Sequence, residues 1–307
     1  MLFKGGTSLS KGYGLIERFS EDIDITVFRE DIDITVFRED IGQPATFEEL
    51  EAMSGKKRNA RLEAIKAACQ EYIQGPMLER LSVLLQQTLK TANMNPDRAR
   101  VEPDPDDPDG QSLLLWYPTV TTDGNAYIRR AIKIESGAKS ALDPHAPVVV
   151  KPYIADDIPS LDLAVANVTT VDPSRTFWDK VIILHGLRRW WDRRGELKGG
   201  GQRVSRHYYD VYRLLASEIG RKATKDSEMA EDCVRHARMF FNRPDLDLAS
   251  AVLGSFALIP HDGMLADLRR DYEAMSGMVF GPIPSVDAVI EAIAELEQRI
   301  NQGQAAI

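Results

Sequence analysis

The spacing of apolar residues changes for the last time at Asp172-Pro173, and this change divides the sequence into two parts. Before it, short apolar or alternating runs are separated by Pro, Gly, Asp and Asn, which is typical of strands. After it, apolar residues recur at helical spacing, with Pro at the first helical position. We therefore expect an α+β fold, with a mixed sheet within residues 1–172 and a helical-bundle domain over 173–307.

The first part contains both strand and helix signals. A capping box, Thr46-Phe-Glu-Glu49, predicts the start of a helical insertion over about 46–92, with breaks near Ser54-Gly55 and Gly75-Pro76. Residues 93–110 are rich in Pro and Asp and predict a solvated loop. The turn at 122–125 predicts that the first two strands form a hairpin. Strands are expected over 113–117, 127–136, 148–154 and 163–171.

Composition excludes several classes of protein. The formal net charge of −9 argues against a nucleic-acid binder held by its overall field. Cys69 and Cys233 are the only cysteines, so a disulfide framework and a cysteine zinc site are excluded. The sequence has no apolar run of eighteen or more residues and no signal-peptide pattern, so we expect a cytoplasmic protein without a membrane partner.

A perfect tandem repeat of nine residues stands near the start, where Glu21–Arg29 is followed directly by an identical Glu30–Arg38. One duplication is not a solenoid, so a recent duplication of coding sequence explains it more simply. A continuous strand through both copies would place their Asp-x-Asp pairs on opposite faces, because nine is odd. A turn near residues 28–32 would instead pair the copies as a hairpin. Only one of the two pairs can face a nucleotide, and the family resemblance described below favours the first copy, which keeps the family's spacing from Gly6.

The first copy also carries the chemistry. On a strand, Asp22 and Asp24 share one face, and carboxylate pairs of this kind suit Mg²⁺ with substrate phosphates. A solvated strand face is the alternative explanation. Sixteen residues before Asp22 stands Gly6, in Lys4-Gly-Gly-Thr-Ser-Leu-Ser10. A glycine pair that leads from a strand into a helix offers backbone N–H groups to phosphates, although an ordinary turn would have the same residues.

These residues carry a family resemblance. The chain resembles the AbiEii-type nucleotidyltransferase toxins, which belong to the DNA polymerase β-like nucleotidyltransferase superfamily. The resemblance covers nearly the whole chain, although Met1 stands close to Gly5 where members of the family usually carry a preceding helical segment. The matching motifs are Gly5–Leu9, Arg18-Phe-Ser-Glu-Asp22-Ile-Asp24, Lys133-Ile-Glu135, Arg175-Thr-Phe-Trp-Asp179-Lys180, Ser205-Arg-His-Tyr-Tyr-Asp210, Asp271–Met275 and Met278–Phe280.

The resemblance implies a role for each matching residue. It implies that Asp22, Asp24 and Glu135 hold two Mg²⁺ ions and that Lys180 neutralises triphosphate charge, making these four the catalytic set. It implies nucleotide contacts for Gly5, Gly6, Thr7, Ser8, Lys11 and Asp210. For Asp210, an ion pair with Arg206 on a helix capped by Ser205 is an equal alternative. His207 is more typical of a structural residue.

A basic, tryptophan-containing stretch completes the candidate site. Arginines beside aromatic side chains suit RNA, and a mobile charged loop is the alternative. The stretch contains Trp190 and Trp191 and seven cations, which are Arg188, Arg189, Arg193, Arg194, Lys198, Arg203 and Arg206. Of these, Arg188, Arg189, Arg193, Arg194 and Arg203 are the candidate RNA-binding residues.

The function that the resemblance implies is a Mg²⁺-dependent nucleotidyltransferase toxin that transfers NMP from an NTP to RNA, with the tRNA 3′ end as acceptor. It also implies a cognate antitoxin, expected to be a DNA-binding regulator encoded nearby. Two alternatives remain open: transfer to a small molecule or a protein, and an inactive nucleotide- or partner-binding protein crippled by the duplication.

Overall fold

The structure is a computed structural model that describes residues 2–20, 22–26, 41–43, 45–118, 131–137, 143–201 and 203–302. For residues 22 and 24–26 the description covers the backbone alone. Two features singled out in the sequence therefore lie outside the described residues, namely the second copy of the repeat at 30–38 and the turn at 122–125.

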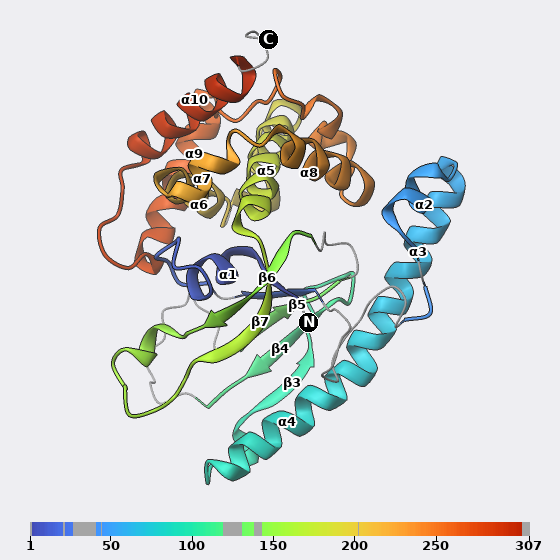
Figure 1. Cartoon of the computed structure of the whole chain (residues 1–307), viewed down its shortest axis with the longest axis vertical. Helices are drawn as coiled ribbons and strands as arrows, with labels where there is room; N and C mark the ends of the chain where they lie inside the picture. Colours follow the sequence, from blue (N-terminus) through green and yellow to red (C-terminus); the bar gives the residue numbers. More distant parts are fainter. Residues whose placement is uncertain are drawn as a thin grey trace.

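A mixed sheet of seven strands occupies one half of the molecule, in the order β3-β4-β5-β2-β1-β7-β6 (Figure 1). The predicted hairpin pairing is confirmed, because β4 and β5 are antiparallel neighbours. The first copy of the repeat supplies β2, which lies between β1 and β5. The strands are β1 (Leu2–Lys4), β2 (Asp22–Thr26), β3 (Arg100–Pro103), β4 (Ser112–Trp116), β5 (Ala131–Glu135), β6 (His145–Val150) and β7 (Val165–Val171).

One strand contradicts the sequence-based expectation. Residues 93–110 were expected to form only a solvated loop, but β3 lies within them and pairs antiparallel with β4. It is an edge strand, and edge strands tolerate Pro because their outer N–H groups need no partner in the sheet. Apart from Pro103, the Pro and Asp residues of this segment lie in the flanks of β3, and Val101 is the β3 side chain that packs on the apolar core.

The helical insertion begins at the predicted capping box, with Thr46 and Glu49 each accepting the other's backbone N–H. The predicted break at Gly75-Pro76 is wrong. A π-helical turn, η1 (Ile73–Met77), joins α3 and α4 without interruption, because the wider turn accommodates a proline that cannot donate a helical hydrogen bond. The insertion forms a long rod beside the sheet (Figure 1), made of α2 (Phe47–Ala52), α3 (Gly55–Tyr72), η1 and α4 (Leu78–Thr91).

The rod covers one face of the sheet. Ile65, Ile73 and Met77 are buried in one cluster with Leu113 and Ile134 from the strands. Side chains alternate along a strand, so residues next to these, such as Glu135, lie on the opposite face. That opposite face is the one available to a functional site.

The second half of the molecule is helical, as predicted. Its first helix begins at Pro173 as expected, with Asp172 as the N-cap that accepts the backbone N–H of Ser174. Phe177, Val181 and Leu184 are buried on its inner face, also as expected. The helices are α5 (Pro173–Arg194), α6 (Ser205–Ala216), α7 (Glu218–Ala223), α8 (Ser227–Phe240), α9 (Asp262–Met275) and α10 (Val286–Gln302).

Two segments connect the halves. Helix α1 (Gly5–Lys11) lies between the sheet and the helical half (Figure 1), and its Leu9 is buried in the core of the helical half. The chain after α1 then pairs with the segment between α9 and α10. Phe19 donates to the carbonyl of Met278 at 2.7 Å, and Phe280 donates to that of Glu17 at 2.8 Å. Strand β7 ends at Val171, so the expected domain division at 172–173 falls between β7 and α5.

Candidate active site

The register of the sheet brings the candidate carboxylates together. Lys4 is the partner of Asp24 in the β1–β2 pair, and Asp24 is the partner of Glu135 in the β2–β5 pair. Glu135 is in turn the partner of Ser112 on β4. Residues in register share a face of the sheet, so these four positions form one row, and Asp22 lies two residues from Asp24 on the same face. The three predicted metal-binding positions are therefore adjacent.

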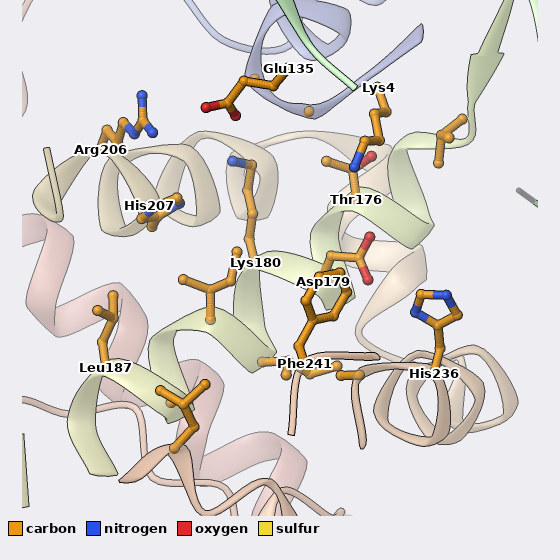
Figure 2. A pocket seen from close by; sticks show the side chains of 18 of the residues that line it. Lys4, Glu135, Thr176, Asp179, Lys180, Leu187, Arg206, His207, His236 and Phe241 are labelled. Carbon is orange, nitrogen blue, oxygen red and sulfur yellow. The ribbon is translucent and has the colours of Figure 1, made fainter. Parts of the chain in front are cut away.

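A cavity of about 400 Å³ lies where this row meets the helical half (Figure 2). Its apolar wall comes mainly from α5, the end of α8 and the turns that follow, and includes Ile182, Leu187, Phe241 and Leu248. Its polar end combines cationic and acidic side chains from both halves of the molecule. The charged residues that line the cavity are Lys4, Arg18, Glu135, Asp179, Lys180, Lys198 and Arg206.

A buried ion-pair network fixes one side of the polar end. Arg18 binds Asp210 through two parallel hydrogen bonds of 2.7 Å, and the Lys180 ammonium lies 2.7 Å from the same carboxylate. Asp210 is completely buried. Burial alone would raise the pKa of Asp210, but Arg18 and Lys180 outweigh it and hold the pKa well below its usual range. Asp210 is therefore a charged anchor that positions both cations.

This network corrects two expectations about α6. Asp210 pairs with residues of other elements, Arg18 and Lys180, in place of the expected intrahelical pair with Arg206. Ser205 is the first residue of the helix, not its N-cap. The N–H groups of Arg203 and Ser205 are instead bound by the carboxylate of Asp271 on α9, at 2.7 Å each. A carboxylate from a distant helix thus satisfies the donors of this N-terminus.

Gly6 is held against Arg18. A Cβ atom at position 6 would lie 2.7 Å from Nη2 of Arg18, which is closer than atoms can approach. The Arg18 guanidinium has little room to retreat, because Asp210 holds it bidentately. Glycine at this position therefore allows the α1 N-terminus to touch the ion-pair network.

The carboxylate of Glu135 is paired with the lysine two residues before it. Nζ of Lys133 lies 2.8 Å from Glu135 Oε1 and 3.4 Å from Asp104 Oδ2. Lys133 is also the register partner of Asp22. In Figure 2 the Glu135 carboxylate and the Lys180 ammonium lie near one another at the polar end of the cavity.

Two further titratable groups line the cavity. Burial raises the pKa of Asp179, although Arg175 and Lys4 oppose the shift. Figure 2 shows its carboxylate on the side of Lys4 and Thr176. Burial lowers the pKa of His207 well below its usual range, and Lys180 and Arg206 lower it further, so this imidazole is neutral at neutral pH. His207 is thus placed at the site as a neutral group.

The chain can now be compared with known proteins. A family model described as "Nucleotidyl transferase AbiEii toxin, Type IV TA system" matches residues 1–292. The chain belongs to this family. Among solved structures, it is similar to the nucleotidyltransferase toxin MenT4 from Mycobacterium tuberculosis H37Rv, with 15% identity, a TM-score of 0.48, and coverage of 97% of this chain and 73% of that one. No curated protein matches the chain.

Membership establishes the general activity. The protein is a nucleotidyltransferase and the toxin of a type IV toxin–antitoxin system, so an antitoxin is its partner. Nucleotidyltransferases of this kind use an NTP and a divalent metal. Among the helices that the structure describes, none is both long and apolar enough to span a bilayer.

The donor set of the AbiEii toxin fits a hard divalent cation. The register makes Asp22, Asp24 and Glu135 neighbours on one face, and carboxylate oxygens are the ligands that Mg²⁺ prefers. Among the described side chains alone, no group of three or more His, Cys, Asp or Glu is arranged to hold a metal. The side chains of Asp22 and Asp24 are not among those described, so the fit rests on register and donor chemistry.

The other predicted nucleotide contacts divide into two groups. Gly5 and Gly6 line the cavity, whereas Thr7 and Ser8 are buried beneath it, and the Ser8 hydroxyl donates to the carbonyl of Gly5. Lys11 is not among the cavity-lining residues. Its ammonium lies over the ring of Tyr153, and burial lowers its pKa to about 8.

The five predicted RNA-binding arginines lie near the end of α5 and before α6, and none of them lines the cavity. Arg188 and Arg189 contact Asp192, and Arg194 pairs with Asp245. Arg193 is exposed. The Arg203 backbone N–H is held by Asp271. From the same basic stretch, it is instead Lys198 and Arg206 that reach the cavity.

Sequence reasoning assigned no site role to Arg18, Lys4 or Asp179, although all three line the cavity. Each falls inside a motif that carried the resemblance or directly beside one. For Arg18, the missing information is a partner 192 residues away in the sequence. For Lys4, the available signal was its place on the strand that leads into the glycine pair.

Proposed function

We propose that this AbiEii toxin transfers NMP from an NTP to a hydroxyl group of RNA, with the 3′ end of tRNA as the acceptor. The observation that carries the proposal is the cavity, in which cationic side chains from both halves of the molecule face the sheet position of Glu135. A triphosphate needs this surplus of positive charge around a metal-binding carboxylate cluster.

In this proposal Asp22, Asp24 and Glu135 hold two Mg²⁺ ions. Bound there, the metal lowers the pKa of the attacking hydroxyl and neutralises charge on the phosphates. The register that makes these residues neighbours supports the assignment. Only one copy of the duplicated Asp-x-Asp can occupy β2, and the first copy does so here.

The chain's own cations bind and orient the triphosphate. Lys180 is placed for this role by Asp210, which fixes its ammonium at the polar end of the cavity. Lys4 and Arg206 approach from β1 and α6, and Lys198 from the turn before α6. Gly6 brings the start of α1 to the same end, where backbone N–H groups can meet a phosphate.

The apolar wall of the cavity is proposed to hold the nucleobase. Phe241 lies half-exposed along it, and Ile182 and Leu187 extend it along α5. An aromatic ring beside aliphatic side chains suits a flat, largely apolar group, while the polar end takes the phosphates. This orientation directs the α-phosphate toward the row of Asp24 and Glu135.

The reaction balances as a single displacement. The acceptor oxygen forms a bond to the α-phosphorus, the bond from that phosphorus to the bridging oxygen of the β-phosphate breaks, and pyrophosphate leaves. The hydroxyl proton passes to solvent water. The chain contributes position and positive charge, which is where most catalysis of phosphoryl transfer originates.

The acceptor is proposed from the distribution of basic residues. Lys198 and Arg206 lie at the cavity, and the exposed Arg193 stands on the same basic stretch. These positions suit an RNA 3′ end that enters the cavity while its backbone follows α5. The proposal also includes a cytoplasmic location and an antitoxin that is a DNA-binding regulator encoded nearby.

The test is transfer of label. Purified protein and Mg²⁺ are incubated with each α-labelled NTP in turn, with and without total bacterial tRNA. We expect label on tRNA with one or more nucleotides, and its loss in Asp22→Ala and Asp24→Ala. Asp287→Ala, which removes an exposed carboxylate on α10, is the matched control and should keep the activity.

The other outcomes are informative. Label on a small molecule or on protein would replace the RNA acceptor. Nucleotide binding without transfer to any acceptor would favour an inactive nucleotide-binding protein. Growth inhibition that survives Asp22→Ala or Asp24→Ala would contradict the metal mechanism.

A further inference from the structure

The acidic face of the sheet contains its own cation, Lys133. It lies on β5 two residues before Glu135, on the same face, and is the register partner of Asp22. Its ammonium lies 2.8 Å from Glu135 and 3.4 Å from Asp104. A lysine thus lies between Asp104 and Glu135, beside the position proposed to bind divalent cations.

The two carboxylates that share Lys133 differ in their surroundings. The Asp104 side chain is only 1% exposed, whereas that of Glu135 is 42% exposed and lines the cavity. Asp104 is also fixed in place, because its Oδ1 accepts the backbone N–H of Asp106 and its own N–H donates to the carbonyl of Ser112. Its Oδ2 faces Lys133.

This geometry makes Lys133 a movable partner of a fixed carboxylate. A shift of well under the length of one bond would bring the ammonium from 3.4 Å to the distance of about 2.8 Å at which it now meets Glu135. The flexible lysine stem allows such a movement at little cost. The half-exposed Glu135 side chain can then turn toward the cavity, while Lys133 keeps Asp104 as its partner.

We propose that Lys133 is a built-in counter-ion that holds Glu135 until a nucleotide brings the metal, and that Asp104 then takes over the ammonium. The inference rests on the proposed metal-binding role of Glu135. Its consequence is that divalent-cation binding depends on nucleotide. A metal without nucleotide meets a resident positive charge, whereas the triphosphate supplies the negative charge that offsets it.

The test measures binding of Mn²⁺ itself, by loss of the free-ion electron paramagnetic resonance signal, with and without a non-reactive α,β-methylene NTP of each base. The variants are Lys133→Met, which keeps the length of the side chain without its charge, and Lys133→Arg, which keeps the charge. Lys222→Met removes a lysine paired with Glu218 on α7 and serves as the matched control.

We expect Lys133→Met to bind Mn²⁺ alone about tenfold more tightly than the wild type, since a unit charge next to a divalent ion is removed. The gain in Mn²⁺ affinity on adding nucleotide should shrink in the same variant. Lys133→Arg and Lys222→Met should behave like the wild type. Lys133→Met alone leaves the buried Asp104 carboxylate without this cation, which could impair folding. The double variant Lys133→Met with Asp104→Asn removes that charge as well, and it should show the same tighter Mn²⁺ binding.

Each contrary outcome has its own meaning. Lys133→Met and the double variant could both bind Mn²⁺ no more tightly than the wild type, while the wild type still shows nucleotide-dependent binding. That result overturns the role of Lys133 and leaves the proposed metal site standing. A wild type that binds no Mn²⁺ even with nucleotide overturns the proposed metal site, and this inference with it.

Discussion

Two carboxylates beside the cavity, Asp210 and Glu135, are each paired with a lysine, yet their surroundings differ. Asp210 is completely buried and bound by two cations, Arg18 and Lys180. Glu135 is 42% exposed and shares one lysine with another carboxylate. A buried anion with two partners cannot leave them without great cost, whereas a half-exposed one can exchange its partner for a ligand. The comparison separates a residue that positions the site from one that binds in it.

The largest expected effect comes from Asp210→Asn. This change removes the buried negative charge that both Arg18 and Lys180 contact, so the free energy of unfolding should fall by about 3–5 kcal/mol. Urea unfolding followed by circular dichroism measures it, with Asp287→Asn, an exposed partner of Arg269, as the control. A loss below about 1 kcal/mol would place Asp210 in the same class as surface pairs.

The free energy of unfolding of the wild type at acidic pH tests the same carboxylate, Asp210. The pKa of Asp210 is lower in the folded protein than in the unfolded chain, because Arg18 and Lys180 outweigh burial. Its contribution is therefore fully present above the unfolded pKa, near 4, and is lost as pH falls through the folded pKa. Unfolding free energies measured from neutral pH to about pH 3 should fall less steeply in Asp210→Asn than in the wild type.

Glu135→Gln should separate the two carboxylates most clearly. We expect transfer activity to fall by about 100-fold, a loss typical of one electrostatic partner of the reacting groups. The free energy of unfolding should change by less than about 1 kcal/mol, because the pair is half-exposed. Label transfer and urea unfolding of one preparation give both values. Equal losses of stability in Glu135→Gln and Asp210→Asn would erase the distinction.

Gly6→Ala is expected to have a smaller effect, which acts through Arg18. The new methyl group would lie 2.7 Å from the Arg18 guanidinium and would push it away from Asp210. A loss of about 1–3 kcal/mol in unfolding free energy is typical of such overpacking. Gly55→Ala, where a Cβ meets no neighbour, is the control. A Gly6→Ala protein as stable as the control would show that Arg18 moves freely.

The smallest effect is expected for Lys11→Met. Its ammonium lies over Tyr153 and its side chain does not line the cavity. The KM for the NTP should stay within about twofold of the wild type, since a cation outside the site contributes little transition-state charge stabilisation. A tenfold rise in KM would show that Lys11 does contribute to binding the nucleotide phosphates.

Sequence patterns predicted most of the elements because those elements depend on local chemistry. Short apolar or alternating runs bounded by turn residues located β4 and β7, and Pro173 located the start of α5. The π turn at Gly75-Pro76 was missed because a proline gives the same local signal whether the helix ends or widens. Strand β3 was missed because its Pro-rich flanks dominate the composition, while its pairing with β4 is a long-range fact.

The site was less predictable from sequence than the fold. The resemblance singled out Lys180 and Asp210, and the structure adds that they bind each other. Arg18 is the residue that joins the N-terminal motif to α6, and nothing local distinguishes it from any other arginine near a carboxylate. Lys133 posed the same difficulty, since its role depends on the buried Asp104, which directly follows a strand that the sequence did not reveal.

The pairing of residues 17–19 with 278–280 affects when the N-terminal segment can fold during synthesis of the chain. Arg18 is an isolated bridge partner of Val279, so the residue that holds Asp210 is itself held by a segment that the ribosome makes much later. Chains arrested before Met278 should show faster proteolysis around Arg18 than full-length chains, and equal protection would contradict this. The contact that holds the backbone of Arg18 can therefore form only when translation is nearly complete.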